Sequence, residues 1–340
     1  MSENHYHLIV IGLGLSGLMA AFTAAQAGKR VLIVGKGTGR LCLFSSSIDL
    51  LNSTQGDMHN ALSSWIAGHP EHPYAKAGPL RTMEALSEFR SLFSAPYLFT
   101  AVGPGNCLVP TGAGTRRATY LVPSTMTAGA EAGPGGLIVG FEHFRDFSAH
   151  QAAAGLDARG VTIPLDVPAG QGLTSLALAR LFEDRSFRGV VLKEIKQVMA
   201  GEERVGFPAV LGLRDPGRVK EELEGGLGAR VFEIPILPPS VPGIRISNRF
   251  KAWFNQGSKV TLLLGPSAGS PMIEDHRCSG LRVMNPPIST IYSADSYVLA
   301  TGRFLSGGLV ADRERVREPL FGLPVIQPES REDWFGPSFF

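Results

Sequence analysis

Three glycines near the start of the chain have the spacing of a phosphate-binding turn. Gly12, Gly14 and Gly17 form the pattern G-x-G-x-x-G, with Ser16 just before the third glycine. In such a turn the first glycine permits a sharp bend, the second lets the backbone approach a phosphate, and the third lets a helix pack closely. The helix N-terminus then presents N–H groups and a partial positive charge. The spacing therefore predicts a nucleotide cofactor at this turn.

The segments around the glycines are those that such a site needs. Residues 7–11 are an apolar run typical of a buried strand, and residues 18–27 predict a helix that Gly28 ends. Residues 30–34 predict a second buried strand. The order strand, turn, helix and strand gives the motif much more weight than an isolated glycine match.

The acidic residue expected at the end of the second strand is absent. A dinucleotide site usually places a carboxylate about 20 residues beyond the glycines, where it binds ribose hydroxyls. Gly35 and Lys36 occupy that position here. Three interpretations stay open at this point. Other groups hold the ribose of FAD, or Lys36 faces a phosphate as in an NADP site, or the cofactor is smaller or the site has decayed.

Hydroxyl and guanidinium groups follow in glycine-rich surroundings. Ser45, Ser46 and Ser47 lie between apolar residues, and two interpretations have equal weight: they cap a helix, or they form a cradle beside a cofactor ring. Arg117, next to Arg116 in a turn-rich segment, has the planar fork that binds a phosphate or carboxylate. A plain surface charge is the alternative for this arginine.

No set of residues in the sequence predicts a metal centre. His69 and His72 are separated by Pro70 in a proline-rich loop and are expected to be solvated. The three cysteines lack the C-x-x-C spacing of zinc and iron–sulfur sites, and their odd number suggests no disulfide framework. We therefore expect a reducing, cytoplasmic environment.

Composition narrows the classes of function. The formal net charge is +2, so electrostatics give no case for binding nucleic acid or an anionic membrane. The uncharged stretch 8–25 could be mistaken for a membrane span, but its glycines stand at turn spacing and no basic segment precedes it. A length of 340 residues with 41 glycines favours one large or two ordinary α/β domains.

The middle of the chain predicts alternating elements. In chain order we expect a loop over 68–79, a helix over 80–95, a strand over 136–141, helices within 173–200, an exposed acidic turn over 220–225, a helix over 244–256, a strand over 259–265 and a hairpin over 280–300.

A second signal comes from the far end of the chain. Residues 298–308, VLATGRFLSGG, predict a buried strand that breaks into a glycine-rich turn containing Thr301 and Gly302. Many flavoproteins return to their first domain through such a turn, whose backbone closes over the dinucleotide. We therefore predict an α/β, Rossmann-like FAD/NAD(P)-binding fold built from both chain ends. The expected bounds are 1–60 and 258–340 for this domain, with a cap or substrate domain inserted over 61–257.

Longer segments narrow the resemblance to one family. The chain carries, in order, IGLGLSGLMAA, FSSSIDLL, HPY, GTRRATYLVP, LPPSVPGIR and VLATGRFLSGGLVADRERVREPLFGLPV. In these segments, from about residue 7 to its end, it resembles the B subunits of anaerobic glycerol-3-phosphate dehydrogenase. That family also tends to lack the acid after the second strand, so its absence does not indicate decay.

The resemblance implies a flavin, either FAD or FMN, and the oxidation of sn-glycerol 3-phosphate to dihydroxyacetone phosphate. It implies flavin phosphates at the glycine turn and the flavin ring near the three serines. Arg117 and Arg245 lie in matched segments and are candidates to bind a substrate phosphate, a flavin phosphate or a structural carboxylate, and Arg303 has weaker support. No residue is identified as the catalytic base. The expected cofactor-binding residues are Gly12, Gly14, Ser16, Gly17, Lys36, Ser45, Ser46, Ser47, Thr301 and Gly302.

The resemblance also implies partners. The family complex contains an A subunit, itself a flavoprotein, and a membrane-attached iron–sulfur C subunit that passes electrons to a quinone. A chain of this kind is expected in the cytoplasm, peripheral at the inner face of the cell membrane only through the complex. Whether it contacts the substrate or only passes electrons from the A subunit stays open.

One departure from the family keeps two other functions open. The family continues beyond Phe340 with a further glycine-rich turn that should complete the flavin site, so the sequence is either truncated or a natural short form. A flavin-free assembly subunit of the same complex is therefore one alternative. A flavin oxidoreductase of the fumarate-reductase type, acting on a dicarboxylate, is another, although it would need several converging Arg and His residues.

Overall fold

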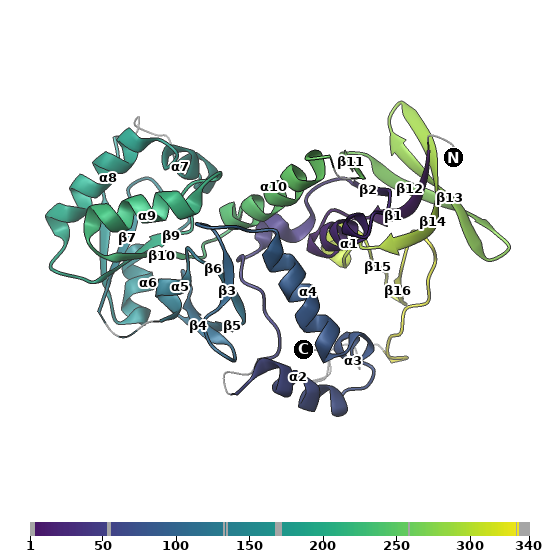
Figure 1. Cartoon of the computed structure of the whole chain (residues 1–340), viewed down its shortest axis with the longest axis horizontal. Helices are drawn as coiled ribbons and strands as arrows, with labels where there is room; N and C mark the ends of the chain where they lie inside the picture. Colours follow the sequence, from purple (N-terminus) through teal and green to yellow (C-terminus); the bar gives the residue numbers. More distant parts are fainter. Residues whose placement is uncertain are drawn as a thin grey trace. The chain divides into compact units, whose positions relative to one another are not determined.

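The computed structural model describes residues 4–52, 56–131, 133, 135–166, 172–257, 259–330 and 332. The chain divides into two compact units, each described by itself below (Figure 1). Unit 1 contains Met1–Leu41 and Phe250–Phe340, and unit 2 contains Cys42–Arg249. Helix α10, Val241–Asn255, belongs to unit 2 up to residue 249 and to unit 1 from residue 250.

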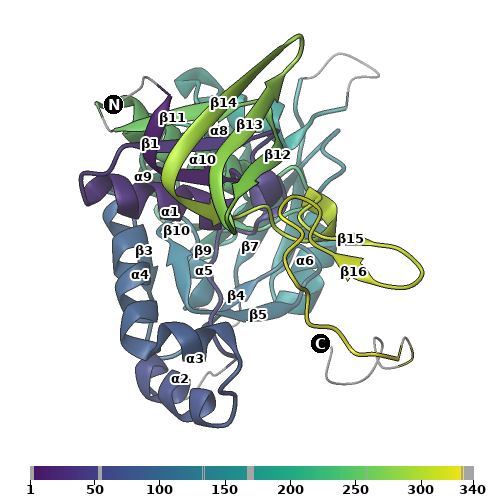
Figure 2. The same ribbon diagram turned by 90° about the vertical axis from the view of Figure 1, so that its right-hand side faces the viewer.

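Unit 1 is built on a six-stranded sheet with the order β11-β2-β1-β14-β13-β12 (Figure 2). The neighbours β11, β2, β1 and β14 run parallel, whereas β14, β13 and β12 form an antiparallel meander. From Leu8 on, the inner strand β1 is apolar, and Ile9 and Val10 are fully buried, as expected of a parallel strand with both faces covered. The bounds are β1 His5–Ile11, β2 Val31–Gly35, β11 Val260–Leu264, β12 Ser267–Glu274, β13 Arg277–Asn285 and β14 Ile288–Leu299.

Helix α1, Leu15–Gln26, follows the first strand and packs through one apolar stripe. Its buried residues Leu18, Ala21 and Phe22 recur at three- and four-residue spacing, which places them on one face. The Phe22 ring meets those of Phe250 and Trp253, with centroids 6.2 and 4.6 Å away, so the end of α10 packs against α1. The remaining elements that involve unit 1 are η1 Gly39–Leu43, η2 Phe304–Ser306, β15 Val310–Ala311 and β16 Val316–Arg317.

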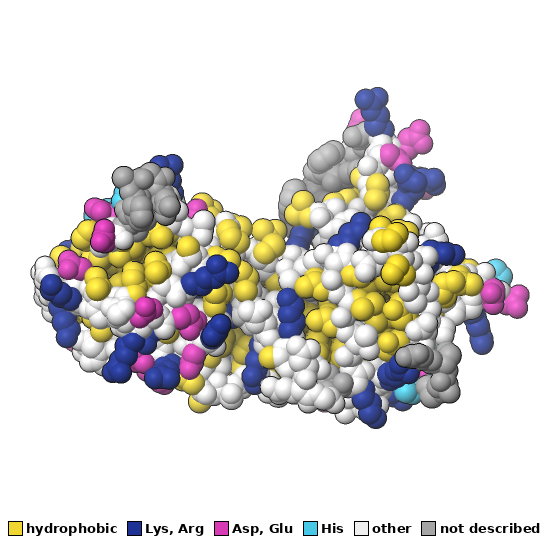
Figure 3. All heavy atoms as spheres, turned by 90° about the horizontal axis from the view of Figure 1, so that it is seen from above, with side chains coloured by type: hydrophobic (Ala, Val, Ile, Leu, Met, Phe, Trp, Pro, Cys, Tyr) yellow, Lys and Arg dark blue, Asp and Glu magenta, His cyan; other side chains and the backbone are white. Residues whose placement is uncertain are grey.

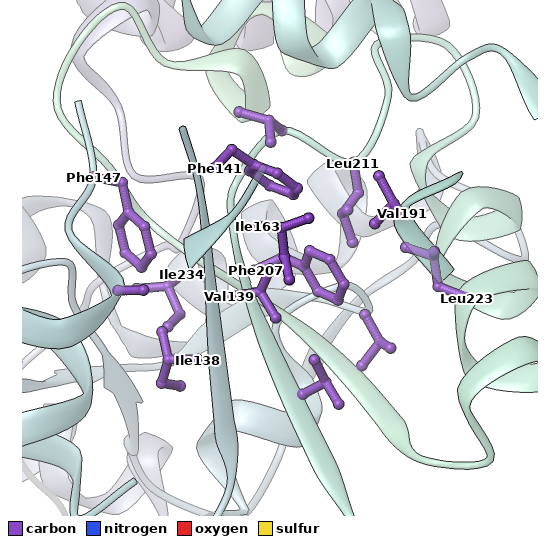
Figure 4. Packing of buried hydrophobic residues seen from close by; sticks show 14 of the residues in the cluster. Ile138, Val139, Phe141, Phe147, Ile163, Val191, Phe207, Leu211, Leu223 and Ile234 are labelled. Atoms are coloured by element: carbon purple, nitrogen blue, oxygen red, sulfur yellow. The ribbon is translucent and has the colours of Figure 1, made fainter. Parts of the chain in front are cut away.

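Unit 2 contains a second, fully parallel sheet with the order β10-β9-β7-β8. Because β8 and β9 flank β7 on opposite sides, the strand order reverses there, at a topological switch point. Figure 4 shows the aliphatic and phenylalanine side chains that pack between this sheet and its helices. The bounds are β7 Leu137–Phe141, α6 Ala149–Leu156, β8 Arg159–Ile163, α7 Ser175–Leu181, α8 Arg185–Val198, β9 Arg204–Pro208, α9 Pro216–Leu227 and β10 Arg230–Ile234.

The rest of unit 2 is a helical segment followed by short hairpins. An aromatic cluster holds the two together, because Phe89 of α4 and Phe93 lie 5.0 and 4.6 Å from Phe99 of β3 between ring centroids. The bounds are α2 Met58–Ala67, α3 Pro73–Ala77, α4 Pro79–Ser91, β3 Phe99–Ala101, β4 Cys107–Pro110, β5 Arg116–Thr119, β6 Leu121–Pro123 and α5 Thr127–Ala130.

Charged side chains of both signs alternate on the surface of unit 2. On the face in Figure 3, Lys and Arg side chains stand among Asp and Glu side chains over the region of α8 and α9. Lys220 and Glu224 form an ion pair in this region with 2.7 Å between them, whereas Arg188, which lies 2.6 Å from Glu222, is buried. No helix among the described residues is both long and apolar enough to cross a membrane.

The predicted α/β fold, with a parallel sheet assembled from both chain ends, is confirmed. Two local predictions are wrong. Residues 220–225 form no exposed turn but lie within α9, which Asp215 caps and which buries Val219 and Leu223. The expected loop over 68–79 contains the short helix α3, capped by the His72 side chain.

The bounds of the two units also differ from those expected. Residues 42–60 cluster with unit 2 instead of the nucleotide-binding domain, and residues 250–257 cluster with unit 1. The reason for the second shift is α10, whose last residues pack their rings on α1. The roles expected of the two units, cofactor binding for the domain of the chain ends and a cap or substrate domain for the insertion, stay predictions.

Candidate functional site

The glycine turn, residues 12–17, is held between the ends of two strands. The Gly12 N–H donates to the Val34 carbonyl at 2.8 Å, and the Ala300 N–H donates to the Ile11 carbonyl at 2.8 Å. Gly12 has φ of 120°, and a Cβ there would lie 2.1 Å from the Ala300 oxygen. Both the conformation and the space therefore require glycine. The structure thus brings the two sequence signals, from opposite ends of the chain, into direct contact.

The start of α1 leaves backbone donors available. Gly14 is the N-cap and receives no side-chain cap, and the first helical bond runs from the Leu18 N–H to the Gly14 carbonyl at 3.0 Å. The N–H groups of residues 15–17 precede that bond and have no partner within the helix. A Cβ on Gly14 would meet nothing within 4 Å, and Ser16 is exposed. These residues fit a phosphate, which needs open space and converging N–H donors.

Gly17 performs a packing role in the same turn. A Cβ at this position would lie 2.0 Å from the Gly12 carbonyl oxygen and 3.3 Å from the Ala300 Cβ. The missing side chain therefore lets α1 approach the ends of β1 and β14. Among the three glycines, Gly12 and Gly17 are needed by the fold, whereas Gly14 faces open space.

The segment after β14 closes into a compact turn in unit 1. Gly302 has φ of 77°, and a Cβ there would lie 2.9 Å from the Ser306 Oγ. A Cβ on Gly308 would lie 2.6 Å from the Thr301 Oγ1, so the turn folds back on itself. Lys36 is exposed just beyond the end of β2. The predicted contacts of Thr301, Gly302 and Lys36 with a cofactor stay predictions.

The three serines and Arg117 come together within unit 2. The Arg117 Nη2 donates to the Ser45 Oγ at 2.8 Å and to the Ser47 Oγ, and its Nη1 donates to the Asp49 Oδ2 at 2.9 Å. We call Ser45, Ser47, Asp49 and Arg117 the serine–arginine cluster. The Arg117 side chain is 41% exposed, so a ligand in solution can reach the guanidinium.

Ser46 differs from its two neighbours. It is fully buried, its φ is 71°, and its Oγ has no hydrogen-bond partner among the described residues. A non-glycine residue in this conformation costs about 1–3 kcal/mol and is typical of functional sites. The helix-cap interpretation of the serines is wrong, because no helix of the described chain begins at residues 45–47.

Unit 2 holds the serine segment by main-chain contacts. Ile48 exchanges backbone hydrogen bonds with Leu121 at 2.9 and 3.1 Å, next to β5, which carries Arg117. Ser240, just before α10, donates its N–H to the Cys42 carbonyl at 2.7 Å and its hydroxyl to the Phe44 carbonyl at 2.5 Å. These bonds fix the hydroxyls relative to the guanidinium.

Arg245 is occupied by a carboxylate of its own chain. Its Nη1 and Nη2 donate to the two Glu233 carboxylate oxygens at 2.7 and 2.8 Å, and its Nε donates to the Gly212 carbonyl at 2.7 Å. Both side chains are almost completely buried. Burial lowers the pKa of the Arg245 guanidinium, but the Glu233 charge outweighs it and leaves the pKa raised. Of the three anions proposed for Arg245, the geometry favours the structural carboxylate.

Sequence reasoning missed the partners of both arginines. Glu233 is the single acid in the apolar strand VFEIPI, and a charge inside a buried strand needs a partner, so this signal was available. Asp49 stands four residues after Ser45 and had no comparable signal.

His69 and His72, the two histidines of the proline-rich segment, pack against the ring of Trp65. The His69 ring stacks on it with centroids 4.0 Å apart, and the His72 ring lies edge-on with centroids 4.6 Å apart.

The remaining candidates give no further site. Arg116 and Arg303 are both exposed. In the part of the chain that the structure describes, no three His, Cys, Asp or Glu residues are placed to hold a metal ion.

Comparison with known proteins finds one cofactor-binding family and a group of similar enzyme subunits. A model of the FAD binding domain family matches residues 7–340. The chain is 33% identical to a probable B subunit of anaerobic glycerol-3-phosphate dehydrogenase from Halobacterium salinarum, over 98% of this chain and 82% of that protein. It is 32% identical to the B subunit of anaerobic glycerol-3-phosphate dehydrogenase from Vibrio cholerae, over 97% of this chain and 80% of that protein.

The solved structures are more distant. A 3-ketosteroid delta1-dehydrogenase from Sterolibacterium denitrificans is 15% identical, with a TM-score of 0.42, and the match covers 88% of this chain and 48% of that chain.

Proposed function

Because the chain belongs to the FAD binding domain family and to the family of anaerobic glycerol-3-phosphate dehydrogenase B subunits, we propose that it is a flavin-binding component of such a dehydrogenase. The reaction is the oxidation of sn-glycerol 3-phosphate to dihydroxyacetone phosphate. The single observation that carries this proposal is the 33% identity over 98% of the chain to a relative with that name.

The glycine turn supports the cofactor part of the proposal. The start of α1 would hold a flavin phosphate through the N–H groups of residues 15–17, because Gly14 leaves open space in front of them. When bound, a flavin supplies the acceptor for the hydride that leaves the carbinol carbon. The Gly12–Ala300 contact keeps the turn rigid, so these donors need no reorganisation when the phosphate arrives.

The serine–arginine cluster supports the substrate part. Arg117 is a candidate to bind the substrate phosphate, since an arginine fork donates two parallel hydrogen bonds to such an anion. Asp49 now accepts from the Nη1 of that fork at 2.9 Å, and Ser45 and Ser47 accept from its Nη2. A phosphate that replaced Asp49 would keep the charge of Arg117 balanced, while the Ser45 and Ser47 hydroxyls would offer further donors.

The partners follow from the family. We propose that the chain assembles with a flavoprotein A subunit and an iron–sulfur C subunit, through which electrons reach a quinone. It would then lie on the cytoplasmic side of the cell membrane, peripheral and attached through the complex. The names of both relatives describe them as subunits, which supports assembly as such without identifying the other chains.

The visible spectrum of the purified chain tests the cofactor, with the released flavin identified by chromatography. We expect flavin absorbance in proportion to protein. Release of FAD would mean that the glycine turn holds a dinucleotide without its acid, whereas release of FMN would explain Gly35 by an absent adenosine. A chain that stays colourless after flavin is added, yet is needed for glycerol 3-phosphate oxidation by the complex, would instead have a flavin-free assembly role.

A further inference from the structure

Leu13 lies against the position where a dinucleotide site carries its acidic residue. Gly35 is the last residue of β2. A Cβ on it would lie 3.1 Å from the Cγ, 3.3 Å from the Cδ1 and 3.2 Å from the backbone nitrogen of Leu13. Carbon atoms in good contact lie about 3.5–4.0 Å apart. Any side chain at position 35 would therefore press on Leu13 with its first carbon.

Space, and not backbone conformation, restricts position 35. Gly35 is not among the residues with positive φ, so an L-amino acid can adopt its backbone without strain. Leu13, in contrast, is only 5% exposed and has little room to turn away. Gly39 restricts the turn further, because a Cβ there would lie 2.9 Å from the Gly14 Cα. The segment after β2 and the glycine turn are thus packed closely together around Leu13.

We propose that Leu13 is a specificity-determining residue of the nucleotide site. Its side chain crowds the position from which a ribose-binding carboxylate would extend, so the site holds its cofactor through phosphate contacts and not through the adenosine ribose. This inference rests on the proposed flavin function. A carboxylate at position 35 gains access to a ribose only after Leu13 is shortened. The pair Leu13 and Gly35 then sets whether the turn distinguishes FAD from FMN.

Flavin titration of the apoprotein tests the proposal. FAD and FMN dissociation constants are measured for the wild type, Leu13→Ala, Gly35→Glu and the double variant. We expect the double variant to shift the ratio towards FAD by about tenfold, because a carboxylate accepts charge-assisted hydrogen bonds from the ribose hydroxyls. Gly35→Glu alone should weaken both flavins without shifting the ratio. Leu13→Ala/Gly35→Gln is the matched control and should keep only a small part of the shift.

Two results would overturn the proposal. The full shift towards FAD in Gly35→Glu alone would mean that Leu13 is no obstacle. An unchanged ratio in a folded double variant that still binds flavin would mean that position 35 does not reach a ribose.

A second measurement separates this inference from the proposed function. The Tm of Gly35→Ala is compared in the Leu13 and Leu13→Ala backgrounds without flavin. We expect a clear loss with Leu13 present and a smaller loss with Leu13→Ala. The shorter side chain removes the contacts with Cγ and Cδ1 and leaves the one with the backbone nitrogen of residue 13. Equal losses in both backgrounds would refute the steric role of Leu13. A wild type that binds no flavin but shows this coupling would instead contradict the proposed function.

Discussion

The parallel strands of the two sheets end in opposite ways at their carboxyl-terminal edges. In unit 1, β1 leads into Gly12 and β14 leads into Ala300, and main-chain atoms form the contact between them. In unit 2, β7 leads into the buried side chains of Phe144 and Phe147, and the three residues after β9, 209–211, are fully buried and apolar.

The difference shows that a strand-order reversal alone does not make a ligand site. Parallel sheets bind ligands in the crevice outside the carboxyl ends of their strands, at the switch point. In unit 2 the residues that follow β7 and β9 fill that region, and the Glu233–Arg245 pair binds the nearby Leu211 and Gly212 backbone. In unit 1 the glycines of the turn have no side chains to fill the corresponding region, and the N–H groups at the start of α1 face it.

The largest effect on stability is expected from Gly17→Ala, in the glycine turn of unit 1. Its methyl group would start 2.0 Å from the Gly12 oxygen, a backbone atom that cannot move aside without displacing the turn. We expect the free energy of unfolding to fall by about 3–5 kcal/mol. Urea unfolding followed by circular dichroism measures it.

Gly189→Ala in α8 is the matched control in unit 2. A Cβ there would meet nothing within 4 Å, so alanine should raise stability by about 0.5–1 kcal/mol through its better helix propensity. A similar small change in both variants would contradict the tight packing of α1 on the turn.

Arg245→Ala tests whether the buried ion pair belongs to the core of unit 2. The variant leaves the Glu233 carboxylate, which is fully buried, without its main partner. Removing one member of such a pair costs about 3–5 kcal/mol. Arg218→Ala, from a pair whose arginine is 69% exposed, should cost less than about 1 kcal/mol in the same urea assay. Unchanged stability together with weaker binding of an anionic ligand would show a ligand-binding role for Arg245.

Arg117→Ala tests how Arg117 differs from the buried Arg245. Arg117 is part exposed and bonded to hydroxyls, so its loss should affect the substrate more than the fold. We expect kcat/KM for glycerol 3-phosphate in the assembled complex to fall about 10- to 100-fold, the size of a lost charge-assisted hydrogen bond or two. Flavin content should stay unchanged.

The neighbour Arg116 provides the control for that measurement. Arg116→Ala removes an exposed charge on the same strand and should leave kcat/KM within about twofold. Arg117→Lys should restore only part of the activity, because lysine lacks the planar fork. Equal effects of the two alanine variants would point to the net charge of the strand instead of a specific site.

Acid is expected to weaken unit 2 before unit 1, as the smallest of these effects. A hydrogen bond from Arg188 holds the pKa of Glu222 below its usual 4.5, and one from Arg230 does the same for Glu131. A lowered folded-state pKa stabilises the fold above pH 4.5, and that stability is lost as the pH falls through the lower value. Hydrogen exchange is measured at about pH 5 and about pH 3.5, on either side of that usual pKa. As the pH falls, β7–β10 should lose more protection than β1 and β2. Equal loss of protection in both sheets would contradict the greater acid sensitivity of unit 2.

The sequence was most informative where a conformation needs a particular residue. Gly12 and Gly17 could be identified in advance because no other residue fits a tight turn against a helix, and the apolar strands on both sides fixed their context. The glycine-rich turn at Thr301 can be predicted from the sequence in the same way. Local patterns of this kind depend only on nearby residues, so they can be read directly.

Contacts between distant residues could not be predicted in the same way. The sequence leaves three kinds of anion open for Arg245, and only the folded chain places Glu233, on β10, beside it. The role that we propose for Leu13 depends on a distance to Gly35 that only the folded turn defines. The serines gave two equal interpretations because a cap and a cradle use the same hydroxyl chemistry.

The Gly14→Ala variant tests the central claim, that the glycine turn of unit 1 holds the flavin phosphate, most directly. A Cβ on Gly14 meets no protein atom within 4 Å and its φ is −72°, so the fold should lose less than about 1 kcal/mol. The methyl group would nevertheless stand where the phosphate approaches the backbone. Flavin titration of the folded variant should show affinity reduced by at least about tenfold. Unchanged flavin affinity in a variant with a wild-type Tm would contradict the account.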